Sequence, residues 1–539
     1  MLILQGKGVW DGVAAGPVKI YRPRAAVTVP HTVTDPAAEQ KRFTEARRQA
    51  QTELAALGKK ALAESGEKTA ALFDVHQLML DDPDYVENVK NLIAQEHLNA
   101  EAAVDQTAAK FAALFAAMDD AYMQARSADV QDISRRVIAC LSGATDAPAL
   151  TEPVLLAAHD LTPSATVALD KSKLLGFLTE AGSPNSHTAI LARTMGIPAV
   201  VAVGACLDQL RDGQQLILDG AAGKIYVDPD AATRQKLLAK QQQEQKQQKL
   251  LADLKGKPNV THSGRTVKIY ANIGRPEEAA VALANDAGGI GLFRSEFLYL
   301  DKETFPTEEE QFQAYKKVLT GMQGREVVIR TLDIGADKQC AYFNLEHEAN
   351  PALGLRAIRI CLTRPEIFKT QLRAILRASA FGKALLMLPM ITSVEEVEAA
   401  KKILHAVQAE LSAAQIPFAK NIPLGIMIET PAAALISDEL ARHVDFFSVG
   451  TNDLTQYTLA LDRQNPHLGQ FFKPHHPALL KLIALAAKNA HAAGIWIGIC
   501  GELGADPALT QQFLELGIDE LSVAPAAILP LRQQVRNLA

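Results

Sequence analysis

The chain has 539 residues, of which 48% are hydrophobic and 22% charged, and its formal net charge is −6. This length allows two to four domains with cores of their own, and the mixed charges leave no broad basic surface for nucleic acid. The first residues lack a charged and then apolar signal pattern, and no apolar run has membrane-spanning length. We therefore expect a cytoplasmic protein that binds no nucleic acid and does not insert into a membrane.

The cysteines are scattered along the chain and odd in number. They are Cys140, Cys206, Cys340, Cys361 and Cys500. None of them forms a Cys-x-x-Cys pair, which argues against a disulfide framework and against a zinc site. Each is by default a small buried apolar residue.

The N-terminal quarter of the chain has the composition of a helical bundle. Residues 12–21 read as a short strand. No proline then occurs between residues 37 and 82 or between 84 and 147, and both segments are rich in Ala, Leu, Glu, Gln and Lys. These residues favour helices, and the acidic and proline residues at 81–84 mark a break. We predict a bundle of about four helices within residues 22–146.

The pattern of the sequence changes after Pro148, from long helical segments to short apolar runs. Short apolar runs at 154–158, 174–178, 199–203 and 216–218 are separated by turn residues. This pattern predicts a small α/β domain formed by residues 1–21 and 147–230.

The next segment is rich in Gln and Lys and contains neither Pro nor Gly from residue 231 until Gly256. It is expected to be a solvent-exposed linker helix within a linker at 231–261.

From residue 265 onward, eight short apolar segments alternate with helical stretches. The segments are 267–272, 289–294, 327–332, 384–390, 423–429, 446–452, 496–502 and 520–524. Eight strands that alternate with helices are the pattern of a (β/α)8 barrel. We therefore predict a multidomain α/β protein in which residues 262–539 form a TIM barrel.

Polar side chains stand at the ends of most of these expected strands. They are Arg294, Arg330, Asp333, Glu429, Asn452, Asp453, Cys500 and Glu502. The active site of such a barrel forms at the carboxyl ends of its strands, so these side chains should converge although they are far apart in the sequence. Asn452 and Asp453, which follow Gly450, are also ordinary residues for the start of a helix.

Arginines and carboxylates in this set point to a phosphorylated ligand. Arginine binds phosphate and carboxylate in bidentate fashion, and a small ligand with several negative charges suits a mouth lined by Arg294, Arg330, Arg356 and Arg463. Two carboxylates with substrate oxygens and water are the usual ligands of Mg²⁺ in phosphoryl-transfer sites, and Glu429 and Asp453 are the candidates. The alternative is that these carboxylates only pair with the arginines.

Cys500 and His187 are the candidate reactive groups. Cys500 is expected at a strand end, where Gly498 and Gly501 leave its thiol uncovered, and a thiol there can pass a proton to carbon. His187 follows a turn at 182–184 and lies in the first turn of an expected helix, where a phosphate carried on its ring would be stabilised. A histidine near a helix start can also be purely structural.

Taken together, these residues resemble phosphoenolpyruvate-protein phosphotransferase, the enzyme I family of the bacterial sugar phosphotransferase system. The resemblance covers essentially the whole chain. It is most specific in Phe-Ser-Val-Gly-Thr-Asn-Asp-Leu-Thr-Gln-Tyr at 447–457 with Arg463, and in Ser-His-Thr-Ala-Ile-Leu-Ala-Arg at 186–193. Ile-Arg-Thr-Leu-Asp-Ile-Gly at 329–335 and Gly-Ile-Gly-Leu-Phe-Arg-Ser-Glu-Phe at 289–297 add to it.

The resemblance implies a role for each candidate residue. His187 would be the phosphorylated nucleophile, reacting through Nε2, and Cys500 would protonate the enol carbon. Glu429 and Asp453 would hold Mg²⁺. Phosphoenolpyruvate would be bound by Arg294, Arg330, Asn452, Asp453 and Arg463.

The resemblance also implies partners. The helical insert would be the docking surface for the small histidine-containing phosphocarrier protein, with His76 and Arg126 near it, and the barrel would form a homodimer. The reaction would be the first step of phosphoenolpyruvate-dependent sugar uptake.

The chain departs from the family pattern in three places. Gly-Ser-Pro-Asn at 182–185 replaces Gly-Gly-Arg-Thr, which removes two phosphate contacts and is expected to affect transfer or the stability of the phosphohistidine. Trp-Asp-Gly at 10–12 replaces Ser-Pro-Gly, and the sequence ends at Ala539 where the family continues with further helix, which bears on dimer strength.

Two other functions fit parts of the sequence. A dikinase that exchanges phosphate between phosphoenolpyruvate and a nucleotide would use the same histidine domain and barrel, but would need a nucleotide-binding domain with a Gly-rich phosphate loop. A phosphoenolpyruvate sensor or scaffold would result if the altered loop before His187 had abolished transfer.

Overall fold

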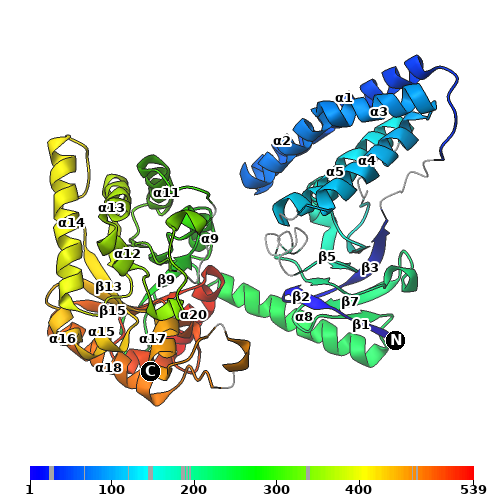
Figure 1. Ribbon diagram of the computed structural model, residues 1–539. Helices are drawn as coiled ribbons and strands as arrows, with labels where there is room; N and C mark the ends of the chain where they lie inside the picture. Colours follow the sequence, from blue (N-terminus) through cyan, green and yellow to red (C-terminus); the bar gives the residue numbers. More distant parts are fainter. Residues whose placement is uncertain are drawn as a thin grey trace. The chain divides into compact units, whose positions relative to one another are not determined.

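The computed structural model describes residues 1–22, 29–65, 67–118, 121–143, 150–183, 189, 192, 196–300, 302–335, 340–463, 465–468 and 471–538. The chain divides into two compact units, Met1–Gln247 and Gln248–Ala539 (Figure 1). None of the helices in the described ranges is both long and apolar enough to cross a membrane.

The second unit is a closed barrel of eight parallel strands, β9 to β16, in which each strand pairs with the next in sequence and β16 pairs with β9. The strands are β9 (Lys268–Ile273), β10 (Ile290–Phe293), β11 (Val327–Arg330), β12 (Ala384–Leu388), β13 (Leu424–Ile428), β14 (Phe446–Val449), β15 (Trp496–Ile499) and β16 (Glu520–Val523). The predicted TIM barrel is confirmed. Every strand begins within one residue of the prediction, and four of the eight end two or three residues earlier.

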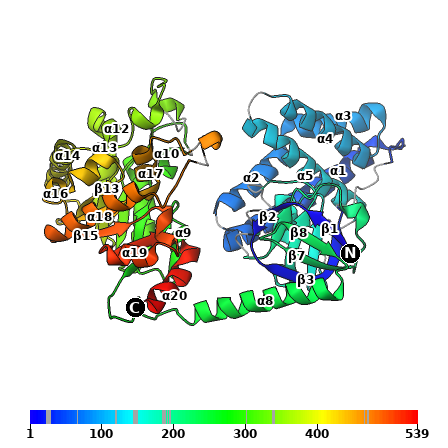
Figure 2. The same cartoon turned by 90° about the horizontal axis from the view of Figure 1, so that it is seen from below.

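Helices lie around the outside of these strands (Figures 1 and 2). They are α9 (Glu278–Ala284), α10 (Phe297–Leu300), α11 (Glu308–Gly321), α12 (Ile358–Thr363), α13 (Pro365–Ser379), α14 (Val394–Ala413), α15 (Pro431–Leu435), α16 (Ser437–Leu440), α17 (Thr451–Leu459), α18 (Pro477–Ala492), α19 (Thr510–Glu515) and α20 (Ile528–Asn537). Two of the longer helices, α11 and α14, begin with capping boxes formed by Thr307 with Glu310 and by Ser393 with Glu396. The main core fills the space between strands and helices.

A second apolar cluster fills the lumen of the barrel. It contains Leu292, Val328, Leu385, Met387, Met427, Phe446 and Cys500, with Trp496 packed against it. The rings of Phe446 and Trp496, at the starts of β14 and β15, stack with centroids 4.5 Å apart. The lumen is therefore a packed core, as expected for this architecture, and is not a pore.

The first unit contains an eight-stranded sheet in the order β1-β8-β7-β3-β4-β5-β6-β2. Its strands are β1 (Leu2–Gln5), β2 (Lys7–Trp10), β3 (Val13–Tyr21), β4 (Val154–Ala158), β5 (Leu174–Thr179), β6 (Ala199–Val201), β7 (Gln215–Asp219) and β8 (Lys224–Val227), and α6 (Pro163–Ala168) follows β4. The small α/β domain is therefore present. The sequence did not indicate β1 and β2, which lie at the two edges of the sheet.

A bundle of helices is inserted between β3 and β4. In the described residues it consists of α1 (Pro36–Ser65), α2 (Glu67–Asp81), α3 (Pro83–Glu96), α4 (Ala100–Ala116) and α5 (Ala121–Ser142), so the predicted bundle of about four helices is present with five. The break expected at 81–84 is the cap of α3, where Asp82 accepts bonds from the backbone N–H groups of Asp84 and Tyr85. Val167 of α6 joins the bundle core.

The linker helix α8 (Ala231–Ala252) is not exposed along its whole length as predicted. Leu237 is buried with Val13 and Ile217 of the sheet. Lys240 Nζ lies 2.7 Å from Asp219 Oδ2, and Glu244 Oε2 accepts a hydrogen bond from the backbone N–H of Val13. The first half of the helix is therefore docked on β3 and β7.

Candidate active site

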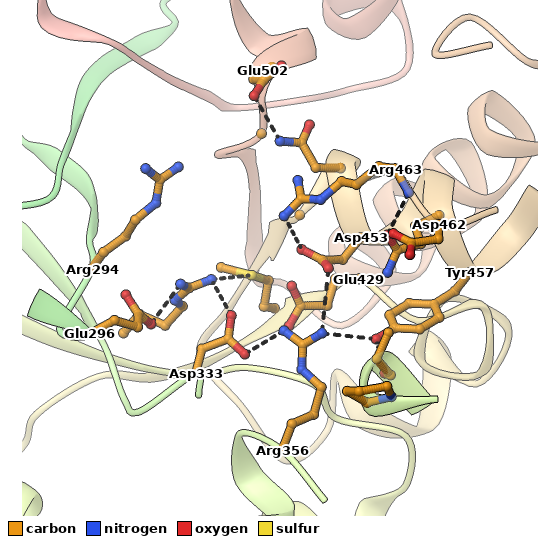
Figure 3. Close-up of a pocket in the computed structure, with 18 of the residues that line it drawn as sticks. Arg294, Glu296, Asp333, Arg356, Glu429, Asp453, Tyr457, Asp462, Arg463 and Glu502 are labelled. Carbon is orange, nitrogen blue, oxygen red and sulfur yellow. Dashed lines mark hydrogen bonds and ion pairs between the residues drawn. The ribbon is translucent and has the colours of Figure 1, made fainter. Parts of the chain in front are cut away.

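A cavity of about 1030 Å³ opens at the carboxyl ends of the barrel strands (Figure 3). Its lining includes all the barrel residues predicted to bind substrate or metal, together with the predicted proton donor. These residues are Arg294, Arg330, Arg356, Glu429, Asn452, Asp453, Arg463 and Cys500. His187, the predicted nucleophile, lies outside the described residues.

Two buried arginines share one carboxylate at the floor of this cavity. Asp333 Oδ2 lies 3.1 Å from Arg330 Nη1, and Asp333 Oδ1 lies 2.8 Å from Arg356 Nη2. Arg330 also donates to Glu296 Oε1 at 2.8 Å. Burial alone would lower the pKa values of Arg330 and Arg356, but the neighbouring carboxylates outweigh it and raise both. Both guanidinium groups are thus fixed in charge and direction.

Glu429 is the most buried carboxylate that lines the cavity. It is 1% exposed, follows β13, and accepts a hydrogen bond from the backbone N–H of Met390 at 2.6 Å. Burial, followed by the negative charges of Asp453 and Asp333, raises the pKa of Glu429 to about 8. Two carboxylates therefore repel each other here, and a cation between them would relieve that repulsion.

Asn452 is not part of β14 as predicted. Asn452 and Asp453 lie in the first turn of α17, for which Gly450 is the cap, so they stand at a helix start, and their binding roles stay predictions. A Cβ atom on Gly450 would lie 2.9 Å from Glu429 Oε2, which is why the turn requires glycine. The helix start brings Asp453 toward Glu429.

Arg294 and Arg463 lie farther from the floor. The Arg463 guanidinium is 3.9 Å from Asp453 Oδ2. Arg294 is exposed, and in Figure 3 no hydrogen bond or ion pair joins its guanidinium to the other residues drawn. Its charge is therefore the least compensated of those that line the cavity.

Cys500 lies at the end of β15 but is not uncovered as predicted. Its side chain belongs to the lumen cluster and the residue is 2% exposed, although it still lines the cavity. Burial is the main cause that raises the pKa of the Cys500 thiol to about 12. The thiol therefore keeps its proton at neutral pH.

Glu296 and Tyr457 were not predicted to be site residues. Glu296 pairs with Arg330, and the Tyr457 hydroxyl accepts a bond from Arg356 at 3.2 Å and donates to the carbonyl oxygen of Ala352. Both residues stand within motif segments that were singled out. Their roles were missed because these contacts join segments far apart in the chain.

Two further candidates lie in the helical bundle. His76 is buried on α2, with Nε2 at 3.3 Å from Asp129 Oδ1. Arg126 donates to Asp129 Oδ2 at 2.9 Å. His76 and Arg126 are therefore joined through one carboxylate of α5.

Glu429 and Asp453 can supply some, but not all, of the ligands of a divalent cation. No group of three or more His, Cys, Asp or Glu side chains is placed to hold a metal in the described part of the chain. Glu429 and Asp453 nevertheless supply hard oxygen donors with unrelieved repulsion. Such a pair fits an ion whose other ligands come from substrate and water.

Comparison with known proteins decides the family. The family model described as "PEP-utilising enzyme, PEP-binding domain" matches residues 248–539, "PEP-utilising enzyme, N-terminal" matches 5–126, and "PEP-utilising enzyme, mobile domain" matches 150–223. A phosphoenolpyruvate-protein phosphotransferase of Bacillus sp. (strain S) is 44% identical over 94% of this chain and 88% of its own. The chain belongs to the phosphoenolpyruvate-protein phosphotransferase family.

Other members of the phosphoenolpyruvate-protein phosphotransferase family match at similar levels. That of Geobacillus stearothermophilus is 44% identical over 94% of this chain and 88% of its own. That of Bacillus subtilis (strain 168) is 41% identical over 99% of this chain and 94% of its own. The resemblance found in the motifs is therefore confirmed over nearly the whole length of the chain.

Proposed function

We propose that this enzyme transfers the phosphoryl group of phosphoenolpyruvate to its own His187 and then to a histidine of a small phosphocarrier protein, releasing pyruvate. This is the first step of phosphoenolpyruvate-dependent sugar uptake. The observation that carries the proposal is the cavity at the barrel mouth, where arginines and two mutually repelling carboxylates meet beside a protonated thiol.

The proposed substrate-binding arginines differ in whether neighbouring carboxylates already hold them in place. Arg330 and Arg356 are fixed by Glu296 and Asp333, so they present preset donors at the floor of the cavity. Arg294 carries the least compensated charge and is placed to meet the incoming anion. Arg463, Asn452 and Asp453 complete the proposed binding set. Preset donors stabilise the transferring phosphoryl group without reorganisation.

Glu429 and Asp453 are the residues that would hold Mg²⁺. When bound, Mg²⁺ supplies positive charge to the phosphate oxygens and orients them. Removal of divalent ions by a chelator is expected to abolish the reaction.

Cys500 acts after phosphoryl transfer. Loss of the phosphoryl group leaves the enolate of pyruvate, whose carbon takes a proton. The Cys500 thiol faces the cavity and holds its proton at neutral pH, so it is the proposed donor. Its S–H bond breaks as the C–H bond of pyruvate forms.

The proposed division of labour follows the two units. Residues 1–21 and 147–230 carry His187, residues 22–146 dock the phosphocarrier near His76 and Arg126, residues 231–261 link the units, and residues 262–539 bind phosphoenolpyruvate. We expect a cytoplasmic homodimer joined through the barrel. Light scattering of the purified protein would measure that oligomeric state.

The test is incubation with Mg²⁺ and phosphoenolpyruvate labelled in its phosphate, with and without the phosphocarrier. We expect acid-labile label on the protein that passes to the carrier, and no label on the His187→Ala variant or after chelation. Cys500→Ala should bind phosphoenolpyruvate but release pyruvate at least a hundred-fold more slowly. Undiminished pyruvate release would refute the role of the thiol, and bound substrate without label would refute transfer.

A further inference from the structure

Glu520 is a buried carboxyl group that the proposed reaction leaves unused. It is the first residue of β16 and is 0% exposed. Neither of its carboxyl oxygens has a hydrogen-bond partner among the residues that the structure describes. Burial of an unpartnered carboxylate is costly, so its presence in the lumen calls for a reason other than stability.

Two glycines make room for this carboxyl group. A Cβ atom on Gly291 would lie 2.1 Å from Glu520 Oε1, and one on Gly498 would lie 1.9 Å from Glu520 Oε2. The carboxyl group therefore occupies lumen space that side chains on β10 and β15 would otherwise fill.

The strand register places Ser448 in the same layer. Gly498 pairs with Ser448 of β14 on one side and with Glu520 of β16 on the other. Side chains point to the same face at every second residue, so Cys500 lies in the next layer toward the carboxyl ends. Glu520, Ser448 and Cys500 thus face one region of the lumen from three adjacent strands.

The Ser448 hydroxyl lies in the same layer as Glu520 and next to the layer of Cys500. Its Oγ is buried and, within the described ranges, has no partner at ordinary hydrogen-bond geometry. It lies close enough to the thiol to act on it: burial raises the pKa of Cys500 to about 12, and the Ser448 hydroxyl acts in the opposite direction. Glu520 also acts on that thiol through its charge.

Burial keeps Glu520 protonated. Burial raises the pKa of its carboxyl group to about 8, Lys268 opposes the rise, and Glu326 adds to it. Lys268 pairs with Glu520 in the strand register, and its side chain is 40% exposed. Lys268 is the first residue of β9, at the amino end of the barrel, so we expect solvent protons to reach this layer from that end.

We propose that Glu520 returns a proton to Cys500 through the Ser448 hydroxyl, so that protons enter the site from the opposite end of the barrel to the substrate. The inference rests on the proposed function, in which Cys500 protonates the enolate. Ser448 and Glu520, which have no hydrogen-bond partner among the described residues, must first rotate into contact. After the enolate is protonated, the thiolate then takes the Ser448 hydroxyl proton while Ser448 takes the Glu520 carboxyl proton. The Glu520 carboxylate regains a proton from solvent, and no electrons are transferred to or from the protein.

The need for such a path follows from burial. Cys500 is 2% exposed, and bound substrate would cover it from the cavity side. Its thiolate would be strongly basic because the thiol pKa is high. Without an internal donor, the thiol would be restored only after product leaves and solvent enters.

The relay can be tested through exchange of the methyl protons of pyruvate in D₂O with Mg²⁺, followed by NMR. In this reverse direction the Cys500 thiolate removes a methyl proton, and deuterium enters only if the thiol proton then reaches solvent. Glu520→Gln keeps the size of the side chain but cannot release a proton, so we expect exchange to fall at least ten-fold. First-turnover labelling by phosphoenolpyruvate precedes the proton step and should change less than two-fold.

Glu326→Gln is the matched control. Glu326 Oε2 lies 3.0 Å from Nζ of Lys268, the lysine that also acts on Glu520, but Glu326 is not a member of the relay. It should leave both rates within two-fold. Unchanged exchange in Glu520→Gln, or an equal loss in Glu326→Gln, would overturn the relay. Ser448→Ala interrupts it independently and should show the same selective loss even if Glu520→Gln does not fold.

The two proposals fail in different ways. A wild-type protein that takes no label from phosphoenolpyruvate contradicts the proposed function. Normal labelling together with undiminished exchange in both Glu520→Gln and Ser448→Ala contradicts only the relay. A wild-type protein that neither takes label nor exchanges the pyruvate methyl protons contradicts both.

Discussion

Asp333 is the residue on which the floor of the cavity depends. It lies 3.1 Å from Arg330 and 2.8 Å from Arg356, and its side chain is 4% exposed. In Asp333→Asn both buried guanidinium groups lose a compensating charge in a place that water reaches poorly. We expect a loss of about 3 kcal/mol in the free energy of unfolding of the barrel, measured by urea titration, and a raised KM for phosphoenolpyruvate.

An exposed ion pair of the same unit provides the control for this variant. Arg364 Nε lies 3.6 Å from Glu366 Oε1, and the Glu366 side chain is 69% exposed. Glu366→Gln should change the free energy of unfolding by less than about 0.5 kcal/mol. If Asp333→Asn cost no more than this control, the buried arginines would not need the shared carboxylate.

For these individual residues, the sequence predicted which side chains meet at the cavity but not how far each is buried. Arg294, Arg330, Glu429 and Cys500 were found because each follows an apolar run that ends at one edge of the barrel. The burial of Cys500 was not predictable from its flanking glycines. It results from the lumen cluster, whose members come from strands separated by long stretches of sequence.

Among the elements, α8 has two halves that differ in burial. Its first half is fixed by Leu237 in an apolar cluster with Val13 and Ile217, whereas Leu250 in its second half is 46% exposed. Leu237→Ala should lower the free energy of unfolding of the first unit by about 2 to 3 kcal/mol, because it removes buried methyl groups and leaves a cavity. Urea titration followed by circular dichroism would measure the change.

Leu250→Ala on the same helix is the matched control. It makes the same chemical change at an exposed position, so its effect on unfolding should stay within about 0.5 kcal/mol. If the two variants had equal effects, the burial of Leu237 would add nothing to the free energy of unfolding beyond the change in helix propensity.

The elements that sequence patterns located are those with strong local signals. All eight barrel strands were found because buried parallel strands are continuous apolar runs bounded by turn residues. In contrast, β1 and β2 are four residues each and largely exposed, and the short apolar run at the start of β1 was not interpreted as a strand. The docking of α8 was also hidden, since Leu237 is its one buried residue among the described side chains of that helix.

For the molecule as a whole, buried carboxyl groups make stability depend on pH. Burial raises the pKa of Glu520 to about 8 from an ordinary value of 4.5, so the folded barrel binds more protons than the unfolded chain between these pH values. This contribution to stability is fully present below about pH 4.5 and is lost as pH rises through about 8. The carboxylates with lowered pKa values, such as Glu308 and Asp286, act below pH 4.5 and do not offset the loss.

We therefore expect the free energy of unfolding of the barrel to fall between pH 5 and pH 8, by on the order of 1 kcal/mol per pH unit for each such group. Glu520→Gln should show a shallower fall than the wild type. Trp496 reports on the barrel lumen, and a Trp10→Phe background would remove the other tryptophan, which lies in the first unit. The two units need not unfold together, so this separate probe is necessary. Identical pH slopes with and without Glu520 would mean that its carboxyl group is solvated or partnered, which would also remove the physical basis for its role as a buried proton donor.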